Sequence, residues 1–220
     1  MALLKTLNFG PVARVYLWRI EESAEELAGT IKLQVAERER LKAIHHPAKK
    51  AEFLALRSCL KLAYGTNPPV SYYKNGKPYL ENGHYISFSH TTGYAAVAIS
   101  EQHPVGVDLE FYRPGIKKVA RKYMRPEESE VLQIETEVEQ LLLYWGAKES
   151  MIKIIGDRRM DFKQQLRVRP FHYRAFQSTD GMIYQQGDTV PVNLIFRKVE
   201  EVYLTLGWLR EPGVGKASDK

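Results

Sequence analysis

The sequence lacks the features that mark secreted, membrane-spanning and cysteine-ligated metalloproteins. Cys59 is the only cysteine among 220 residues, which excludes an internal disulfide and a zinc cluster of cysteines and fits a reducing compartment. The first ten residues contain no long apolar run, so they predict no signal peptide, and no later run is long enough to span a bilayer. These absences predict a cytoplasmic protein with no membrane partner.

The sequence also lacks the common motifs for nucleotide and zinc sites. Neither GxxxxGK[ST] nor GxGxxG occurs, so we expect neither a P-loop nor a Rossmann-type site. HExxH is absent, and His45 and His46 have no acid at zinc-ligand spacing. A phosphate or metal site must therefore be built from other residues.

Charge is present with a moderate basic excess. Lys and Arg number 32 against 26 Asp and Glu, which gives a formal net charge of +6. Such an excess favours an anionic partner, namely a nucleic acid, a nucleotide or an acidic protein. A solvated surface with no special partner would account for it equally well.

Hydrophobic patterning predicts an α+β protein made of two similar α/β halves, each with a long helix packed on a small, mostly antiparallel sheet. We expect halves at 1–104 and 105–212 and a disordered tail at 213–220. Helices are predicted at 21–28, 35–44, 47–64, 116–123, from Pro126, and at 137–155. Strands are predicted at 12–20, 85–89, 94–100, 104–110, 165–168, 183–185, 190–196 and 202–209.

The predicted strand Val105-Gly106-Val107-Asp108-Leu109-Glu110 has two unlike faces. Alternation places the valines and leucine on one side, and Gly106, Asp108 and Glu110 on the other. Two close carboxylates repel each other unless a cation lies between them, and Mg²⁺ is usually held by one or two carboxylates plus substrate phosphates. The glycine would leave room for a ligand. An exposed polar strand face would give the same pattern.

A helical stripe adds a third carboxylate. Leu142, Trp145, Glu149, Ile152 and Gly156 recur at spacings of three and four, which places Glu149 within an apolar stripe. A carboxylate there must be paired, hydrogen-bonded or bound to metal. The neighbouring lysines at 148 and 153 could satisfy a buried Glu149. They could instead bind phosphate beside a site of three acids.

A possible phosphate cradle lies upstream. Asn75-Gly76 is a strong turn signal, and it precedes Lys77. Ser89 and His90 end a predicted strand, and with Lys77 they could surround a phosphate. A histidine at a strand end is equally typical of a solvated turn.

Together these segments resemble the motifs of 4′-phosphopantetheinyl transferases of the longer, surfactin-synthetase-activating type. The two signature motifs are Val-Gly-Val-Asp-Leu-Glu at 105–110 and Trp-Gly-Ala-Lys-Glu-Ser-Met-Ile-Lys at 145–153. Asn-Gly-Lys-Pro-Tyr at 75–79 and Ser-Phe-Ser-His at 87–90 resemble two further motifs. The resemblance covers roughly residues 46–155, and it implies the two-half, monomeric fold of that family.

The resemblance implies a reaction and roles for residues. A serine of an acidic apo acyl or peptidyl carrier protein would attack Mg²⁺-bound coenzyme A, accept the phosphopantetheine arm and release 3′,5′-adenosine bisphosphate. The implied metal ligands are Asp108, Glu110 and Glu149, and the implied catalytic residues are Glu149, Lys148 and Lys153. The implied coenzyme A contacts are Arg57, Lys77, Ser89, His90, Asp108, Lys148 and Lys153.

Three features depart from the resemblance or match it loosely. Gly146 stands where the family usually has a small polar residue, and a glycine inside a helix costs up to about 1 kcal/mol relative to alanine, so we expect close packing there. The segment 154–162 lacks the family's glycine-leucine rhythm. Glu128 could match a further family acid, although its place at a helix start explains it equally well.

Two other functions compete with the transferase. A non-enzymatic basic module could bind nucleic acid or an acidic protein through Arg57 and the cations of 158–174, with interleaved aromatic residues for stacking. Three acids at the place where phosphates would approach argue against nucleic acid. A degenerate relative could bind coenzyme A without transferring its arm, although every expected ionisable position is filled.

Overall fold

A computed structural model describes residues 3–185 and 187–210 as an α+β fold with two antiparallel sheets. The first has the order β1-β2-β6-β5: β1 (Leu3–Asn8), β2 (Arg14–Arg19), β6 (Tyr94–Ser100) and β5 (Tyr85–Thr91). The second has the order β7-β11-β10-β9-β8: β7 (Val105–Phe111), β11 (Val202–Leu209), β10 (Asp188–Val199), β9 (Phe176–Gln185) and β8 (Leu166–Val168). The tail expected at 213–220 lies outside the described residues.

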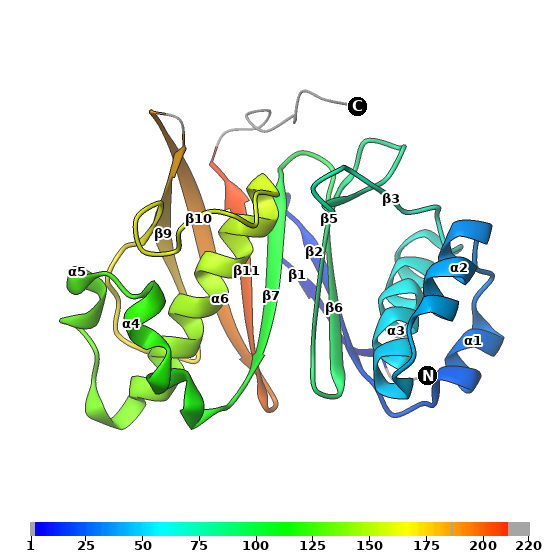
Figure 1. Cartoon of the computed structure of the whole chain (residues 1–220), viewed down its shortest axis with the longest axis horizontal. Helices are drawn as coiled ribbons and strands as arrows, with labels where there is room; N and C mark the ends of the chain where they lie inside the picture. The colour runs from blue at the N-terminus through cyan, green and yellow to red at the C-terminus, as the bar shows by residue number, and fades with distance from the viewer. Residues whose placement is uncertain (1–2, 186, 211–220) are drawn as a thin grey trace.

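Helices lie on the outer side of each sheet (Figure 1). The first half carries α1 (Ala24–Thr30), α2 (Val35–Ala43), α3 (Pro47–Tyr64) and a hairpin of β3 (Ser71–Tyr72) and β4 (Pro78–Tyr79). The second half carries η1 (Pro114–Lys118), α4 (Ala120–Tyr123), α5 (Pro126–Ser129), η2 (Ile134–Thr136) and α6 (Glu137–Ile155). Both long helices have the predicted bounds, and the fold class is confirmed.

The first sheet is buried on both faces. Tyr16 and Trp18 of β2 pack against the helices of the first half, whereas Val15 and Leu17 pack in a core shared with the second sheet. The alternation of a strand explains this division, because successive side chains point to opposite faces. The shared core also contains Val105, Val107 and Leu109, as the alternation of that strand predicts.

The seam between the sheets joins the edge strands β5 and β7, which lie side by side (Figure 1). Serine hydroxyls of β5, rather than its backbone carbonyls, accept hydrogen bonds from the backbone of β7. Ser87 Oγ accepts from the Val107 N–H at 3.0 Å, and Ser89 Oγ accepts from the Leu109 N–H at 3.1 Å. The two serines of the Ser-Phe-Ser-His segment therefore hold the carboxylate-bearing strand against the first half. The expected division at 104/105 stays a prediction, although each sheet draws its strands from one side of it.

Some elements differ from the sequence predictions. β1 was not predicted, because Leu7 is its only buried residue and no apolar alternation marks it. β9 begins seven residues before the predicted strand at 183–185, since its first half is polar. The first helix begins at Ala24 rather than at Glu21, because Ser23 and Glu26 form a capping box there. The predicted helix at 116–123 is divided into η1 and α4.

Candidate active site

A cleft of about 500 Å³ lies between the two halves. One wall comes from α3, the β3–β4 hairpin and β5, and the other from α6 and the loop after it. Basic side chains from both walls line it beside one carboxylate and three aromatic rings: Lys77, His90, Lys153, Arg158, Glu149, Tyr72, Phe88 and Phe162. Such a lining suits a polyanionic ligand with an aromatic group.

Asp108 and Lys153 form the polar centre behind the cleft wall. Lys153 Nζ lies 2.7 Å from Asp108 Oδ1 and also donates to the Val107 carbonyl at 2.8 Å and to Ser89 Oγ at 3.2 Å. Ser89 Oγ donates to the same Asp108 Oδ1 at 3.1 Å. The Asp108 side chain is 7% exposed and that of Lys153 is 26% exposed, so the pair joins the interior to the cleft.

The other oxygen of Asp108 has no partner. Oδ2 is buried and accepts no hydrogen bond. A Cβ on Gly146 would lie 3.4 Å from this oxygen and 2.8 Å from Thr205 Oγ1, so α6 approaches β7 and β11 closely here. The close packing expected at Gly146 is confirmed.

Gly106 has a different role from the predicted one. A Cβ on Gly106 would lie 2.0 Å from the Ser150 carbonyl oxygen, so this glycine makes room for the backbone of α6. The expectation that it leaves space for a ligand is wrong. Its close contact with the Ser150 backbone instead sets the position of α6 against β7, the strand that carries Asp108.

The three acids of the resemblance affect one another electrostatically. Burial, and then the Asp108 carboxylate, raise the pKa of Glu149, which Lys153 and Arg158 partly offset. Burial, and then Asp108, also raise the pKa of Glu110 to about 7, despite an ion pair of 2.9 Å with Arg113. Glu149 lines the cleft, whereas Asp108 and Glu110 lie behind it along β7.

These donors fit Mg²⁺ by their chemistry. Asp108 keeps an oxygen without a hydrogen-bond partner, and burial, followed by the Asp108 carboxylate, raises the pKa values of Glu110 and Glu149. Over residues 3–185 and 187–210, no three His, Cys, Asp or Glu side chains are gathered closely enough to hold a metal. Mg²⁺ commonly takes only one or two carboxylates and completes its shell with water and substrate phosphates.

Lys77 ties the first half to the end of α6. Its Nζ donates to the Ile154 carbonyl, and burial lowers its pKa to about 8. Gly156 ends α6 with a φ of 88°, and a Cβ there would lie 2.7 Å from Asn75 Nδ2. The Asn75-Gly76 turn therefore packs on this left-handed cap and brings Lys77 into the cleft wall.

His90 lies near the end of β5, on the same wall of the cleft as Lys77. Its Nδ1 lies 2.9 Å from Glu52 Oε2, which Lys49 also contacts at 2.7 Å. Burial lowers the pKa of His90, and the nearby lysines lower it further, while Glu52 and Asp108 raise it. The His90 side chain is 44% exposed and lines the cleft, and its contact with Glu52 distinguishes it from a solvated turn residue.

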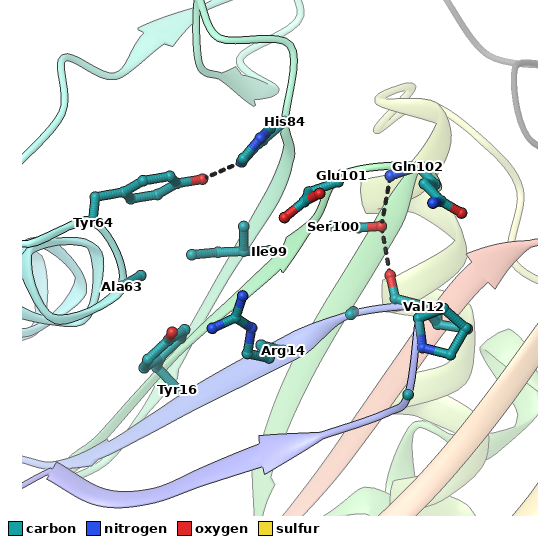
Figure 2. A pocket seen from close by; sticks show the side chains of 13 residues that line it. Val12, Arg14, Tyr16, Ala63, Tyr64, His84, Ile99, Ser100, Glu101 and Gln102 are labelled. Atoms are coloured by element: carbon teal, nitrogen blue, oxygen red, sulfur yellow. Dashed lines mark hydrogen bonds between the residues drawn. The ribbon is translucent and has the colours of Figure 1, made fainter.

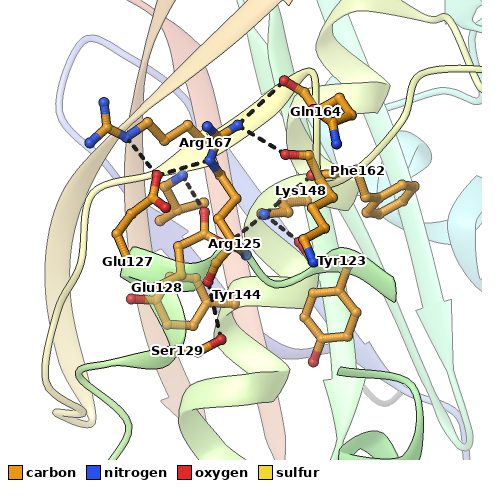
Figure 3. A network of polar contacts seen from close by, with 12 residues as sticks. Tyr123, Arg125, Glu127, Glu128, Ser129, Tyr144, Lys148, Phe162, Gln164 and Arg167 are labelled. Atoms are coloured by element: carbon orange, nitrogen blue, oxygen red, sulfur yellow. Dashed lines mark hydrogen bonds and ion pairs between the residues drawn. The ribbon is translucent and has the colours of Figure 1, made fainter. Parts of the chain in front are cut away.

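The structure corrects the predicted position of Lys148. This side chain is fully buried and points away from the cleft into the network of Figure 3. Its Nζ donates to Glu128 Oε2 at 2.7 Å and to the carbonyls of Tyr123 and Phe162 at 2.6 and 3.2 Å. All three N–H donors are engaged, so the predicted phosphate contact of Lys148 does not fit its placement. The buried Glu–Lys pair of α6 involves Glu128, not Glu149.

Arg57 also lies apart from its predicted contact. It is 1% exposed, pairs with Glu37 at 2.6 Å and donates to the Tyr72 hydroxyl at 3.0 Å. It does not line the cleft, although it supports Tyr72, which does. Its place in the core gives it the role of an anchor rather than a direct nucleotide ligand.

Sequence reasoning missed Arg158, Phe162 and Tyr72 as cleft residues. Arg158 was read only as part of a basic loop. The signal that could have found it is Gly156, because a left-handed cap reverses the chain directly after the last turn of α6. Phe162 stacks on Trp145 at 5.0 Å between ring centroids, and this contact holds the loop against the helix.

A second cavity of about 380 Å³ lies in the first half (Figure 2). The Tyr64 hydroxyl and His84 Nδ1 are 2.8 Å apart within it, and Arg14 and Glu101 also line it. It shares no lining residue with the cleft, and no residue of the predicted site lines it.

Comparisons with known proteins identify the family of this chain. A profile of the 4′-phosphopantetheinyl transferase superfamily matches residues 104–203. The 4′-phosphopantetheinyl transferase HetI of Nostoc sp. is 32% identical over 165 residues, which cover 65% of this chain and 69% of that protein. A 4′-phosphopantetheinyl transferase of Bacillus subtilis is 28% identical over 64% of this chain and 68% of its own length. The 4′-phosphopantetheinyl transferase gsp of Aneurinibacillus migulanus is 27% identical over 69% of this chain and 63% of its own length. The chain belongs to the 4′-phosphopantetheinyl transferase family and is an enzyme of that class.

Proposed function

We propose that the enzyme transfers the 4′-phosphopantetheine arm of coenzyme A to a serine of an apo acyl or peptidyl carrier protein, with Mg²⁺. The observation that carries this proposal is the cleft between the halves, where cations from both walls surround Glu149 in front of Asp108. A pyrophosphate and a further phosphate need several cations, and the adenine and pantetheine groups need aromatic and apolar walls.

Each cleft residue has a role in this reaction. Lys77, His90 and Arg158 bind phosphates, and Tyr72 or Phe162 offers a face for the adenine ring. Asp108, with one of its acidic neighbours Glu110 and Glu149, would hold the metal, which would supply a Lewis acid that neutralises the pyrophosphate. Lys153 contacts the pyrophosphate and stabilises the leaving group.

Glu149 is the base. Its raised pKa, caused by burial and by Asp108, strengthens it as a proton acceptor. The serine oxygen forms a bond to the β-phosphorus of coenzyme A, and its proton passes to the Glu149 carboxylate. The bond from this phosphorus to the bridging oxygen breaks, and 3′,5′-adenosine bisphosphate leaves with the electron pair.

The partner is an acidic carrier protein, which fits the formal net charge of +6. Action in fatty acid or polyketide biosynthesis, a monomeric state and a cytoplasmic location stay predictions. So does the absence of nucleic acid and membrane partners. Over the described part of the chain, no helix combines the length and apolar character that crossing a membrane requires.

The direct test is a mass measurement. The protein is incubated with coenzyme A, Mg²⁺ and apo carrier proteins from fatty acid, polyketide and peptide synthesis. We expect a phosphopantetheine mass increase on at least one carrier protein, an equal amount of 3′,5′-adenosine bisphosphate, and neither when a chelator removes the metal. No mass increase on any carrier protein, or full transfer in the chelator, would overturn the proposal.

A further inference from the structure

The surroundings of Asp108 restrict how a cation can reach it. Oδ2 is buried against α6 near Gly146 and Thr205. Oδ1 is the oxygen on the side of the cleft residue Lys153, whose Nζ lies 2.7 Å away. A divalent ion that approaches Asp108 from the cleft therefore arrives at a position that the Lys153 ammonium already occupies.

Lys153 has no donor to spare in this position. An ammonium has three N–H donors, and those of Lys153 are directed at Asp108 Oδ1, the Val107 carbonyl and Ser89 Oγ. It cannot bind a phosphate at the same time without giving up one of these contacts. Its proposed role at the pyrophosphate therefore requires it to leave Asp108.

We propose that Lys153 and the divalent cation are alternative partners of Asp108, and that the arriving ion displaces Lys153 into the cleft. This inference rests on the metal site of the proposed function. Two cations at one largely buried carboxylate oxygen repel each other, so the divalent ion and the Lys153 ammonium cannot both stay there. The lysine is the one that leaves, because its long flexible side chain moves readily. Lys153 is suited to such a movement because it lines the cleft and its side chain is 26% exposed, while Asp108 is fixed by Ser89.

The exchange couples the metal to coenzyme A. Before exchange, the ammonium is neutralised by Asp108 and adds little attraction for phosphate. After exchange, the ion neutralises Asp108 and the freed ammonium faces the pyrophosphate. Each ligand should therefore raise the affinity for the other by the same factor, as thermodynamic linkage requires.

Binding of Mn²⁺, measured by electron paramagnetic resonance or calorimetry with and without coenzyme A, tests the exchange. Lys153→Met should bind Mn²⁺ alone at least about tenfold more tightly than the unaltered protein, because no ammonium competes for Asp108. Coenzyme A should then raise the Mn²⁺ affinity of Lys153→Met less than that of the unaltered protein. Lys153→Gln serves as a second variant if the first does not fold.

Two controls separate the exchange from the metal site itself. Lys42→Met removes one positive charge from an exposed pair with Glu39, outside the residues that line the cleft, and should bind Mn²⁺ as the unaltered protein does. Asp108→Asn should lose the binding. If Asp108→Asn loses binding while Lys153→Met binds equally or more weakly, the exchange is overturned and the metal site stands. If Asp108→Asn binds normally, both the exchange and the proposed metal site fail.

Discussion

Two lysines of α6, five residues apart, each lie 2.7 Å from a carboxylate oxygen, yet they stand in opposite surroundings. Lys148 and Glu128 are both fully buried, and every donor of the ammonium has a partner. Lys153 and Asp108 are 26% and 7% exposed, and one Asp108 oxygen has no partner. The two distances are equal, but the Lys148–Glu128 ion pair is closed to solvent, whereas the Lys153–Asp108 ion pair is open to the cleft.

The difference lies in what surrounds each carboxylate. Glu128 accepts from the Val168 and Arg125 N–H groups at 2.8 Å as well as from Lys148, so it joins β8, α5 and α6. Asp108 instead has two acidic neighbours whose pKa values it helps to raise. A carboxylate with hydrogen-bond partners at both oxygens, such as Glu128, holds structural elements together. A carboxylate with one unpartnered oxygen beside further acids, such as Asp108, suits a cation.

The largest effect should come from Asp108→Asn. The change removes the charge that would hold a metal and leaves Lys153 without its counterion, while the shape of the side chain is kept. We expect the rate of phosphopantetheine transfer to fall by roughly 10³-fold, since one preorganised electrostatic group is worth that order. Transfer is measured by the mass of the carrier protein, and thermal unfolding checks the fold. Near-normal transfer would remove Asp108 from the site.

Lys148→Met should act on stability. Breaking a buried pair leaves Glu128 charged and uncompensated, at a cost of about 3–5 kcal/mol. The double variant Glu128→Gln with Lys148→Met should recover part of this loss, because both charges are then gone while an amide oxygen can still accept one of the two backbone N–H groups at this position. Urea unfolding of the single and double variants gives both values. A single variant as stable as the unaltered protein would mean that the pair does not hold this region together.

Gly146→Ala should disturb the Lys153–Asp108 ion pair from the α6 side of Asp108. The added methyl would lie 2.8 Å from Thr205 Oγ1 and 3.4 Å from Asp108 Oδ2, so a neighbour must move. We expect a stability cost of about 1–3 kcal/mol and a larger proportional loss of transfer rate. Gly29→Ala in α1 is the matched control, since no atom lies within 4 Å of its added Cβ. It should instead gain about 0.5–1 kcal/mol. Equal effects of the two substitutions would contradict the close packing at Asp108.

The smallest effect should be a pH dependence from Glu110. Its pKa is raised from 4.5 to about 7 in the folded protein, chiefly by burial, so the folded state holds this proton more tightly than the unfolded state. Its contribution to stability is therefore fully present below pH 4.5 and is lost as the pH rises towards 7. Unfolding free energies of Glu110→Gln should show a flatter slope over this window. An unchanged slope would mean that Glu110 titrates normally.

Sequence reasoning predicted the long helices well because each has strong boundary signals. Pro47 begins α3, and a glycine ends both α3 and α6. The alternation over 105–110 correctly separated a core face from the face that carries Asp108. β1 escaped prediction because its burial depends on the neighbouring strand rather than on its own pattern.

The site was harder to predict because a motif does not say where each side chain points. Lys148 and Glu149 are adjacent in sequence, but successive residues of a helix are about 100° apart, so they face different surroundings. Lys153 follows Glu149 by about one turn and faces the same cleft. Helical phase could have separated the lysines. The partner of Lys148 is Glu128 of α5. This helix has only four residues, and so short a segment does not predict where the helix packs.

The most direct test of this account compares Lys148→Met and Lys153→Met in transfer rate and in free energy of unfolding. We expect Lys153→Met to lose most of its transfer rate and to lose less stability than Lys148→Met, because the Lys153–Asp108 pair is partly exposed to the cleft. We expect Lys148→Met to lose more stability, and the fraction that is still folded to transfer at a rate much nearer to normal. The reverse result, with Lys148→Met stable and inactive and Lys153→Met active, would contradict it.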